Sequence, residues 1–152
     1  MLPFIGRLKT VNAEVSITSI NYICLELSNV ERLHKEVLLR TQQNPQPLRD
    51  SNSLISALNK PKMEAKYLEA DLIRQAAVLC VGISQAQAFV DGNKRTAVAV
   101  TETFLRMNGF RIPNPQSKDL PRLLNEVAER INDREQAIKE FEAWLRQVIA
   151  PN

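Results

Sequence analysis

The sequence predicts an all-α fold in one compact domain of 152 residues. Three observations lead to this prediction. The length is that of a single ordinary domain. Only 4 residues are glycine, which argues against a turn-rich β sandwich. Apolar residues recur at helical spacing through most of the chain after residue 29. Because aromatic residues make up only 5%, the core is expected to consist of Leu, Ile, Val and Ala.

The first helix is expected over residues 29–40, after a capping box formed by Ser28 and Glu31. Residues 1–27 are the least informative part of the chain. Within them, the stretch 15–27 mixes β-branched and polar residues and is compatible with either a short strand or a short helix.

Residues 41–50 carry two prolines and no periodicity, so they are expected to form a loop, as a simple connector rather than as an edge that binds a target. Asp50 or Ser51 then caps a short helix that Pro61 ends. A long helix is expected at about 64–86, with neighbours on most sides. Its apolar stripe consists of Tyr67, Leu68, Leu72, Ala76, Leu79, Cys80 and Ile83.

A second buried helix is expected to follow the string FVDGNKRT at residues 89–96 and to end at an Asn108-Gly109 cap. A loop is expected at 111–119. Two helices then close the domain within residues 120–150. The first covers about 120–130, and the second opens with a capping box at 132–135. The apolar residues of these three helices are Ala97, Val100, Thr101, Phe104 and Leu105, then Leu120, Leu123, Leu124, Val127 and Ile131, then Ile138, Phe141, Trp144, Leu145 and Val148.

The composition limits the compartment and the partners. The net charge of +3 suits an anionic ligand, but no run of Lys and Arg exceeds two residues, so direct binding to nucleic acid is not expected. Cys24 and Cys80 lie in apolar stretches without a C-x-x-C motif and are expected to be buried thiols in a reducing compartment. No apolar run approaches membrane length, and residues 1–6 are too short for a secretory signal. We therefore expect a cytoplasmic protein without a membrane anchor.

The string at 89–96 combines several features of an anion site. A helix N-terminus offers unpaired amides and a partial positive charge. Gly92 removes a side chain where a phosphate approaches the backbone. Lys94 adds a point charge, and Arg95 is able to bind phosphate oxygens in bidentate fashion. The alternative is an ordinary helix cap with solvated cations, and the residues alone favour neither interpretation.

Other residues of the string have complementary chemistry. Asp91 offers a carboxylate for a magnesium ion that bridges phosphates. Asn93 provides both a hydrogen-bond donor and an acceptor. Phe89 is an apolar anchor for the loop.

The string resembles the signature of the Fic/Doc family. That signature reads His, any residue, Phe, any residue, Asp or Glu, Gly or Ala, Asn, and then Lys-Arg or Gly-Arg. The Lys-Arg form resembles the death-on-curing (Doc) branch. The resemblance covers about residues 28–112, because further matches lie outside the loop. These are Leu33-His34, Leu48-Arg49-Asp50, Leu54 to Leu58 with Pro61, Tyr67, Ala76-Ala77, and Phe104-Leu105 with Asn108-Gly109.

The resemblance implies a helical bundle with the phosphate loop between two central helices. It also implies transfer of a group from ATP, with Mg²⁺, to a hydroxyl of a target protein. The group is AMP in most Fic proteins and the terminal phosphoryl group in Doc. Doc-type members are toxins that act on elongation factor Tu and are neutralised by an antitoxin. The implied nucleotide-binding residues are Phe89, Gly92, Asn93, Lys94, Arg95 and Thr96, and the implied catalytic residues are Gln87, Asp91, Lys94 and Arg95, with Asp91 as the metal ligand.

Gln87 occupies the position of the family's histidine, which is the general base. Glutamine does not accept a proton near neutral pH, and loss of a general base costs about 10²–10⁴ in rate. The sequence does not distinguish a natural glutamine from a deliberate inactivation. The only histidine, His34, is expected to be a packed, hydrogen-bonded residue rather than a substitute base.

Three functional hypotheses follow from these residues. The chain is a Doc-type transferase weakened by Gln87, a pseudoenzyme that binds nucleotide or antitoxin, or a plain helical interaction domain. The inhibitory string of some Fic proteins is not found: Thr10 and Glu14 have its spacing, but Val15 follows. Inhibition is therefore expected to come from a partner protein.

Overall fold

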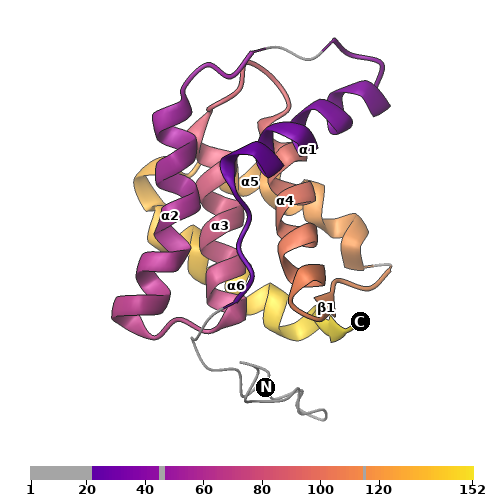
Figure 1. Cartoon of the computed structure of the whole chain (residues 1–152). Coiled ribbons are helices and arrows are strands. Elements are labelled where there is room, and N and C mark those ends of the chain that lie inside the picture. The colour runs from indigo at the N-terminus through magenta and orange to yellow at the C-terminus, as the bar shows by residue number, and fades with distance from the viewer. Residues whose placement is uncertain (1–21, 45–46, 115) are drawn as a thin grey trace.

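The computed structural model describes residues 22–44, 47–114 and 116–152 (Figure 1). Helices dominate this part of the chain, which confirms the predicted all-α fold. The elements in order are α1 (Leu27–Arg40), α2 (Ser51–Leu68), α3 (Leu72–Ala86), α4 (Asn93–Met107), β1 (Phe110–Arg111), η1 (Gln116–Asp119), α5 (Leu120–Ala128), η2 (Ile131–Asp133), α6 (Arg134–Val148) and β2 (Ala150–Pro151).

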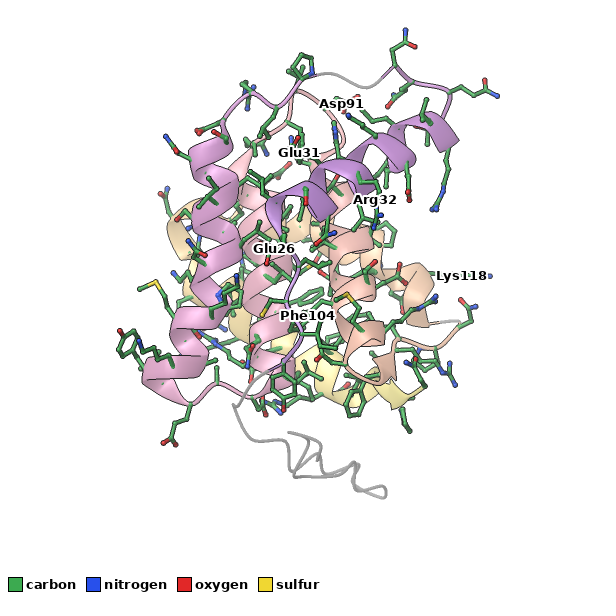
Figure 2. All side chains as sticks on the ribbon, in the orientation of Figure 1. Glu26, Glu31, Arg32, Asp91, Phe104 and Lys118 are labelled. Carbon is green, nitrogen blue, oxygen red and sulfur yellow. The ribbon has the colours of Figure 1, made fainter. Side chains whose placement is uncertain are left out.

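Helix α3 is the centre of the bundle. It packs against α2, α4, α5 and α6, and Figure 1 shows it between α2 and α4. Figure 2 shows Phe104 of α4 within the middle of the bundle, and this side chain is only 2% exposed. The nearly continuous apolar sequence of α3 is explained by these neighbours on most sides, as the sequence predicted.

The expected helix over residues 64–86 is wrong, because the chain turns within it. Helix α2 ends at Leu68, Glu69 adopts a left-handed conformation with φ 54°, and α3 begins after Asp71. The Asp71 carboxylate accepts the Arg74 N–H at 2.9 Å and so caps the new helix. Tyr67 is 66% exposed, so it does not belong to the buried stripe of α3.

Pro61 does not end a helix, contrary to the sequence prediction. It lies inside α2, where it is buried. Proline removes one intrahelical hydrogen bond. The packing of α2 along α3, with Ala57 against Gly82, stabilises the helix through this point. The predicted start of this helix is confirmed, because Asp50 accepts the Ser53 N–H at 3.1 Å.

Helix α1 begins at Leu27 rather than at residue 29. The Asn29 side chain accepts the N–H of Glu26 at 2.8 Å, so the cap is formed two residues before the predicted Ser28–Glu31 box.

The predicted capping box at 132–135 is also not formed. Asp133 precedes α6, but its side chain makes no capping hydrogen bond. The Asp133 carboxylate accepts from Arg130 at 2.8 Å instead, and Asn132, which the predicted box needs as its N-cap, lies inside the short helix η2.

Helices α4, α5 and α6 confirm the other helix predictions, and Asn108 is the C-cap of α4. The segment 111–119 is not all loop, because it contains the end of β1 and the short helix η1. Strand β1 pairs with β2 in an antiparallel arrangement that the sequence analysis missed. Residues 22–26 form neither helix nor strand, and the rest of the ambiguous stretch 15–27, up to residue 21, lies outside the described residues.

Among the described helices, none combines the length and the apolar character that crossing a membrane requires.

Candidate active site

A cavity of about 650 Å³ lies at the end of the bundle where α3 passes into α4. Figure 2 shows Asp91 at this end of the molecule, beside α1. The loop between α3 and α4 forms one wall of the cavity, α1 and α5 contribute two others, and the first turns of α4 form the base. The lining residues are Val37, Arg40, Thr41, Gln87, Val90, Asp91, Gly92, Asn93, Lys94, Arg95, Val98, Pro121 and Asn125.

Helix α4 begins at the cavity. The Thr96 N–H donates to the Gly92 carbonyl at 2.9 Å, which is the first intrahelical bond. The N–H groups of residues 93–95 therefore precede the helical ladder and carry the partial positive charge of the helix N-terminus. Gly92 has φ 82°, and a Cβ there would lie 3.0 Å from the Leu38 side chain. The turn thus requires glycine both for its conformation and for its space.

Asn93 stabilises the loop from within. Its Oδ1 accepts the Phe89 N–H at 3.0 Å, and its Nδ2 donates to the Phe89 carbonyl at 2.9 Å. The side chain is 8% exposed, so these bonds are largely shielded from water. Asn93 consequently shapes the loop as well as lining the cavity.

His34 supports the same loop from α1. Its Nε2 lies 2.8 Å from the Asp91 carbonyl, and because a carbonyl only accepts, Nε2 carries the hydrogen. The imidazole stacks on Phe89, with ring centroids 3.7 Å apart and an interplanar angle of 11°. At 1% exposed it lies behind the loop and does not line the cavity. The prediction of a packed, hydrogen-bonded histidine is confirmed.

The segment before α2 holds the other side of the loop. The N–H groups of Arg49 and Asp50 donate to the Ala88 carbonyl at 2.8 and 3.0 Å. The Arg49 guanidinium donates to the Gln87 carbonyl at 2.6 Å, and Leu48 forms an isolated antiparallel bridge with Phe89. Residues 48–50 are therefore more than the simple connector that the sequence predicted. The match of Leu48-Arg49-Asp50 to the family pattern was the signal for this role.

The two cations of the loop are held on opposite sides of the cavity. Lys94 Nζ donates to Asn125 Oδ1 of α5 at 3.0 Å. Arg95 donates to Thr41 Oγ1 at 3.1 Å and to Gln43 Oε1 at 3.2 Å, just after α1. Sequence reasoning did not find Thr41, Gln43 or Asn125, because they come from segments distant in the chain.

Asp91 is exposed at the cavity, and its Oδ1 accepts the Gly92 N–H at 2.8 Å. The described residues contain no group of three or more His, Cys, Asp or Glu side chains able to hold a metal ion. Magnesium is commonly bound by one or two carboxylates together with substrate phosphates and water. A single exposed carboxylate beside a helix N-terminus fits that donor set, and Asp91 would be the protein ligand.

Gln87 is the C-cap residue of α3, in a left-handed conformation with φ 53°. Its Nε2 lies 3.4 Å from the Ser84 carbonyl, and its Oε1 lies 3.5 Å from Asn93 Nδ2. The side chain is exposed and lines the cavity, at the position where the resemblance expects the general base. The described lining residues include one carboxylate, Asp91, and no histidine.

Two of the expected nucleotide-binding residues do not line the cavity. Phe89 is 2% exposed and packs in the core as the predicted anchor. Thr96 is fully buried, and its Oγ1 has no hydrogen-bond partner among the described residues. The structure brings the other expected site residues together around one cavity, namely Gln87, Asp91, Gly92, Asn93, Lys94 and Arg95.

Comparison with known proteins agrees with this geometry. The model of the Fic/DOC family matches residues 24–105, which include α1 to α3, the loop, and α4 except for its last two residues. Toxin Doc from Mycolicibacterium smegmatis is 37% identical over 86 residues, which are 55% of this chain and 66% of that protein. The chain thus matches just under two thirds of that relative's length, and α5 and α6 lie beyond the family match. The matched region comprises more than half of the sequence and every loop residue described above, and the chain therefore belongs to the Fic/DOC family.

Proposed function

We propose that this protein is a Doc-like transferase of a toxin–antitoxin pair, which moves a phosphoryl or AMP group from ATP to a hydroxyl of a target protein. One observation carries the proposal. A cavity of about 650 Å³ combines the free N-terminus of α4, the cations Lys94 and Arg95, and the family's catalytic position at residue 87. That volume lies within the range typical of small-ligand sites.

Each residue has a defined task in this proposal. The α4 amides and Gly92 receive phosphate oxygens, and Lys94 and Arg95 offset the negative charge that the transferred group carries. Asp91 holds magnesium, which neutralises phosphate charge when it is bound. Phe89 and Thr96 support the loop from the core and do not touch the ligand.

Gln87 weakens the reaction in this proposal. It is able to orient a hydroxyl through a hydrogen bond but does not remove its proton. Phosphoryl transfer depends mainly on positioning and charge stabilisation, which the other residues still supply. We propose residual transfer about 10²–10⁴-fold below that of a chain with histidine at this position.

The alternative is a pseudoenzyme that binds nucleotide or antitoxin without transferring a group. The exposed glutamine at the general-base position favours it. Both proposals place the protein in the cytoplasm, since Cys24 and Cys80 are free thiols, as expected of a reducing compartment. Both also include an antitoxin, as the relative's name suggests.

Calorimetric titration with Mg·ATP tests the site. The chain is expected to bind, and Arg95→Ala is expected to bind at least tenfold more weakly, because a bidentate phosphate contact is lost. Arg32→Ala is the matched control, since Arg32 is exposed on α1 and only faces Glu36 at 4.0 Å. Equal loss in both variants, or no binding by the folded parent chain, would contradict the proposal.

Transfer is tested with purified elongation factor Tu and ATP labelled at either the γ or the α phosphate. Gln87→His is expected to raise the incorporation of label by 10²–10⁴-fold over the parent chain. Incorporation from the γ position identifies phosphoryl transfer, and incorporation from the α position identifies AMP transfer. Nucleotide binding without transfer by the histidine variant would support the pseudoenzyme instead.

A further inference from the structure

Neutral side chains hold two of the cations that line the cavity, Lys94 and Arg95. The amide oxygen of Asn125 accepts from Lys94 at 3.0 Å, and the hydroxyl of Thr41 and the amide oxygen of Gln43 accept from Arg95 at 3.1 and 3.2 Å. None of these three acceptors carries a charge. The ammonium and the guanidinium therefore keep their full positive charge while their positions are restricted.

Three arginines outside the cavity are held by carboxylates instead, although Arg134 also donates to a neutral acceptor, the Gln85 amide oxygen, at 2.6 Å. Arg74 donates to Glu64 at 2.8 Å, and Arg130 donates to Glu140 at 2.7 Å. Arg146 donates to Glu142 at 2.6 Å. Each of these ion pairs cancels charge locally and links two turns or two helices.

The cavity keeps an excess of positive charge as a result. Arg40 also lines it, and Asp91 is the one carboxylate among its described lining residues. Asp91 lies in the loop itself and, among the described residues, forms no ion pair with Lys94 or Arg95, whose side chains are bonded to α5 and to the end of α1. Two separated and uncompensated charges suit a ligand whose anionic groups are also spread along its length.

We propose that Asn125, Thr41 and Gln43 are positioning residues that separate Lys94 and Arg95 without neutralising them, so that the cavity accepts a chain of phosphate groups. This inference rests on the proposed nucleotide site and extends it in two directions. It gives α5, which lies beyond the region of the family match, a part in ligand binding. It also predicts that binding of the phosphate groups depends on residue 125 being uncharged.

Asn125→Asp separates this role from a merely structural one. Aspartate keeps the shape and the oxygen acceptor, so a structural role predicts that it replaces asparagine without loss. In the proposed role, the added charge cancels Lys94, and Mg·ATP binds about tenfold more weakly at low salt. Asn125→Ala, which frees Lys94 but leaves its charge, is expected to lose only about threefold, so the order is parent, then alanine, then aspartate.

The matched control is Asn59→Asp, which changes the net charge equally. Asn59 is exposed on α2, which Figure 1 shows on the opposite side of α3 from α4. It is expected to stay within about twofold of the parent. The loss caused by Asn125→Asp is expected to shrink as salt is raised to about 0.5 M, because screening weakens charge interactions. Thermal unfolding of each variant verifies that the fold is intact.

The outcomes separate this inference from the proposed function. If the parent binds Mg·ATP and Asn125→Asp binds equally well, the inference is overturned while the nucleotide site stands. If the parent does not bind Mg·ATP, titration with inorganic tripolyphosphate follows. If the parent binds tripolyphosphate and Asn125→Asp binds it more weakly, the inference is supported without the nucleotide. If the parent does not bind tripolyphosphate, or if both bind it equally, the inference and the proposed nucleotide site are both overturned.

Discussion

Replacement of His34 by alanine is expected to destabilise the protein and to loosen the loop between α3 and α4. Alanine at this position would lose two interactions of His34 and leave the space of its ring unfilled. The hydrogen bond to the Asp91 carbonyl is worth about 1 kcal/mol net. The stacked pair with Phe89 adds about 0.5–1.5 kcal/mol. The space left by the buried ring costs about 1–2 kcal/mol, at roughly 24 cal/mol per Å³ of unfilled volume.

These contributions overlap, since all three arise from the same ring. We therefore expect a loss of about 3 kcal/mol in the free energy of unfolding. Urea titration measures this loss, followed both by far-UV circular dichroism and by the fluorescence of Trp144. Trp144 is the only tryptophan and lies on α6, near Phe141, so its signal reports global unfolding rather than the loop. Coincident transitions would justify a two-state analysis.

His34→Phe is the control, because phenylalanine keeps an aromatic ring against Phe89 but does not donate to Asp91. It is expected to lose only about 1 kcal/mol of stability. Binding of Mg·ATP is expected to weaken in both variants, since the carbonyl that precedes Gly92 is released. A loss below about 1 kcal/mol for His34→Ala would refute the view that this ring fixes the loop.

Two further predictions concern the turn at Gly92 and the ion pair between Arg74 and Glu135. Gly92→Ala is expected to cost about 1–2 kcal/mol in urea titration, because φ 82° is unfavourable for alanine and its Cβ would lie 3.0 Å from Leu38; an unchanged midpoint would contradict this. Arg74 donates to Glu135 and lowers the pKa of that carboxyl. The Glu135 carboxylate therefore stabilises the fold above the usual glutamate pKa, and this stabilisation is lost as the pH falls through the lowered pKa. Unfolding measured from pH 6 to pH 3 is therefore expected to show a shallower acid decline in Glu135→Gln than in the parent, and parallel curves would exclude this contribution.

Local sequence signals predicted the fold where the partners of each residue are near in the chain. Asp50 was predicted as a cap because its carboxylate accepts from the N–H of Ser53, only three residues away. Pro61 was misjudged because the loss of one helical bond is a local effect, whereas the stabilising contacts of α2 with α3 are not. The turn at Glu69 was missed because a non-glycine residue in the left-handed region leaves no clear mark in the sequence.

The candidate site also shows this difference between partners that are near in the chain and partners that are distant. The loop and its helix were predicted from one continuous string of residues. The acceptors of its two cations were not, since Asn125 lies 31 residues from Lys94 and Thr41 lies 54 residues from Arg95. The hydrogen bond from Arg49 to the Gln87 carbonyl joins residues that are 38 positions apart, so no local pattern predicts it.

The central place of α3 also governs how the site moves. Its amides are enclosed by four other helices, so their exchange with solvent hydrogen is expected to be among the slowest in the protein. Helix α1 has an open outer face, with Leu39 61% exposed, and is expected to open at a lower free-energy cost. Arg95 is held at the end of α1, whereas residue 87 caps α3. Hydrogen exchange is therefore expected to be faster at the end of α1, where Arg95 is held, than in α3, whose C-cap is Gln87.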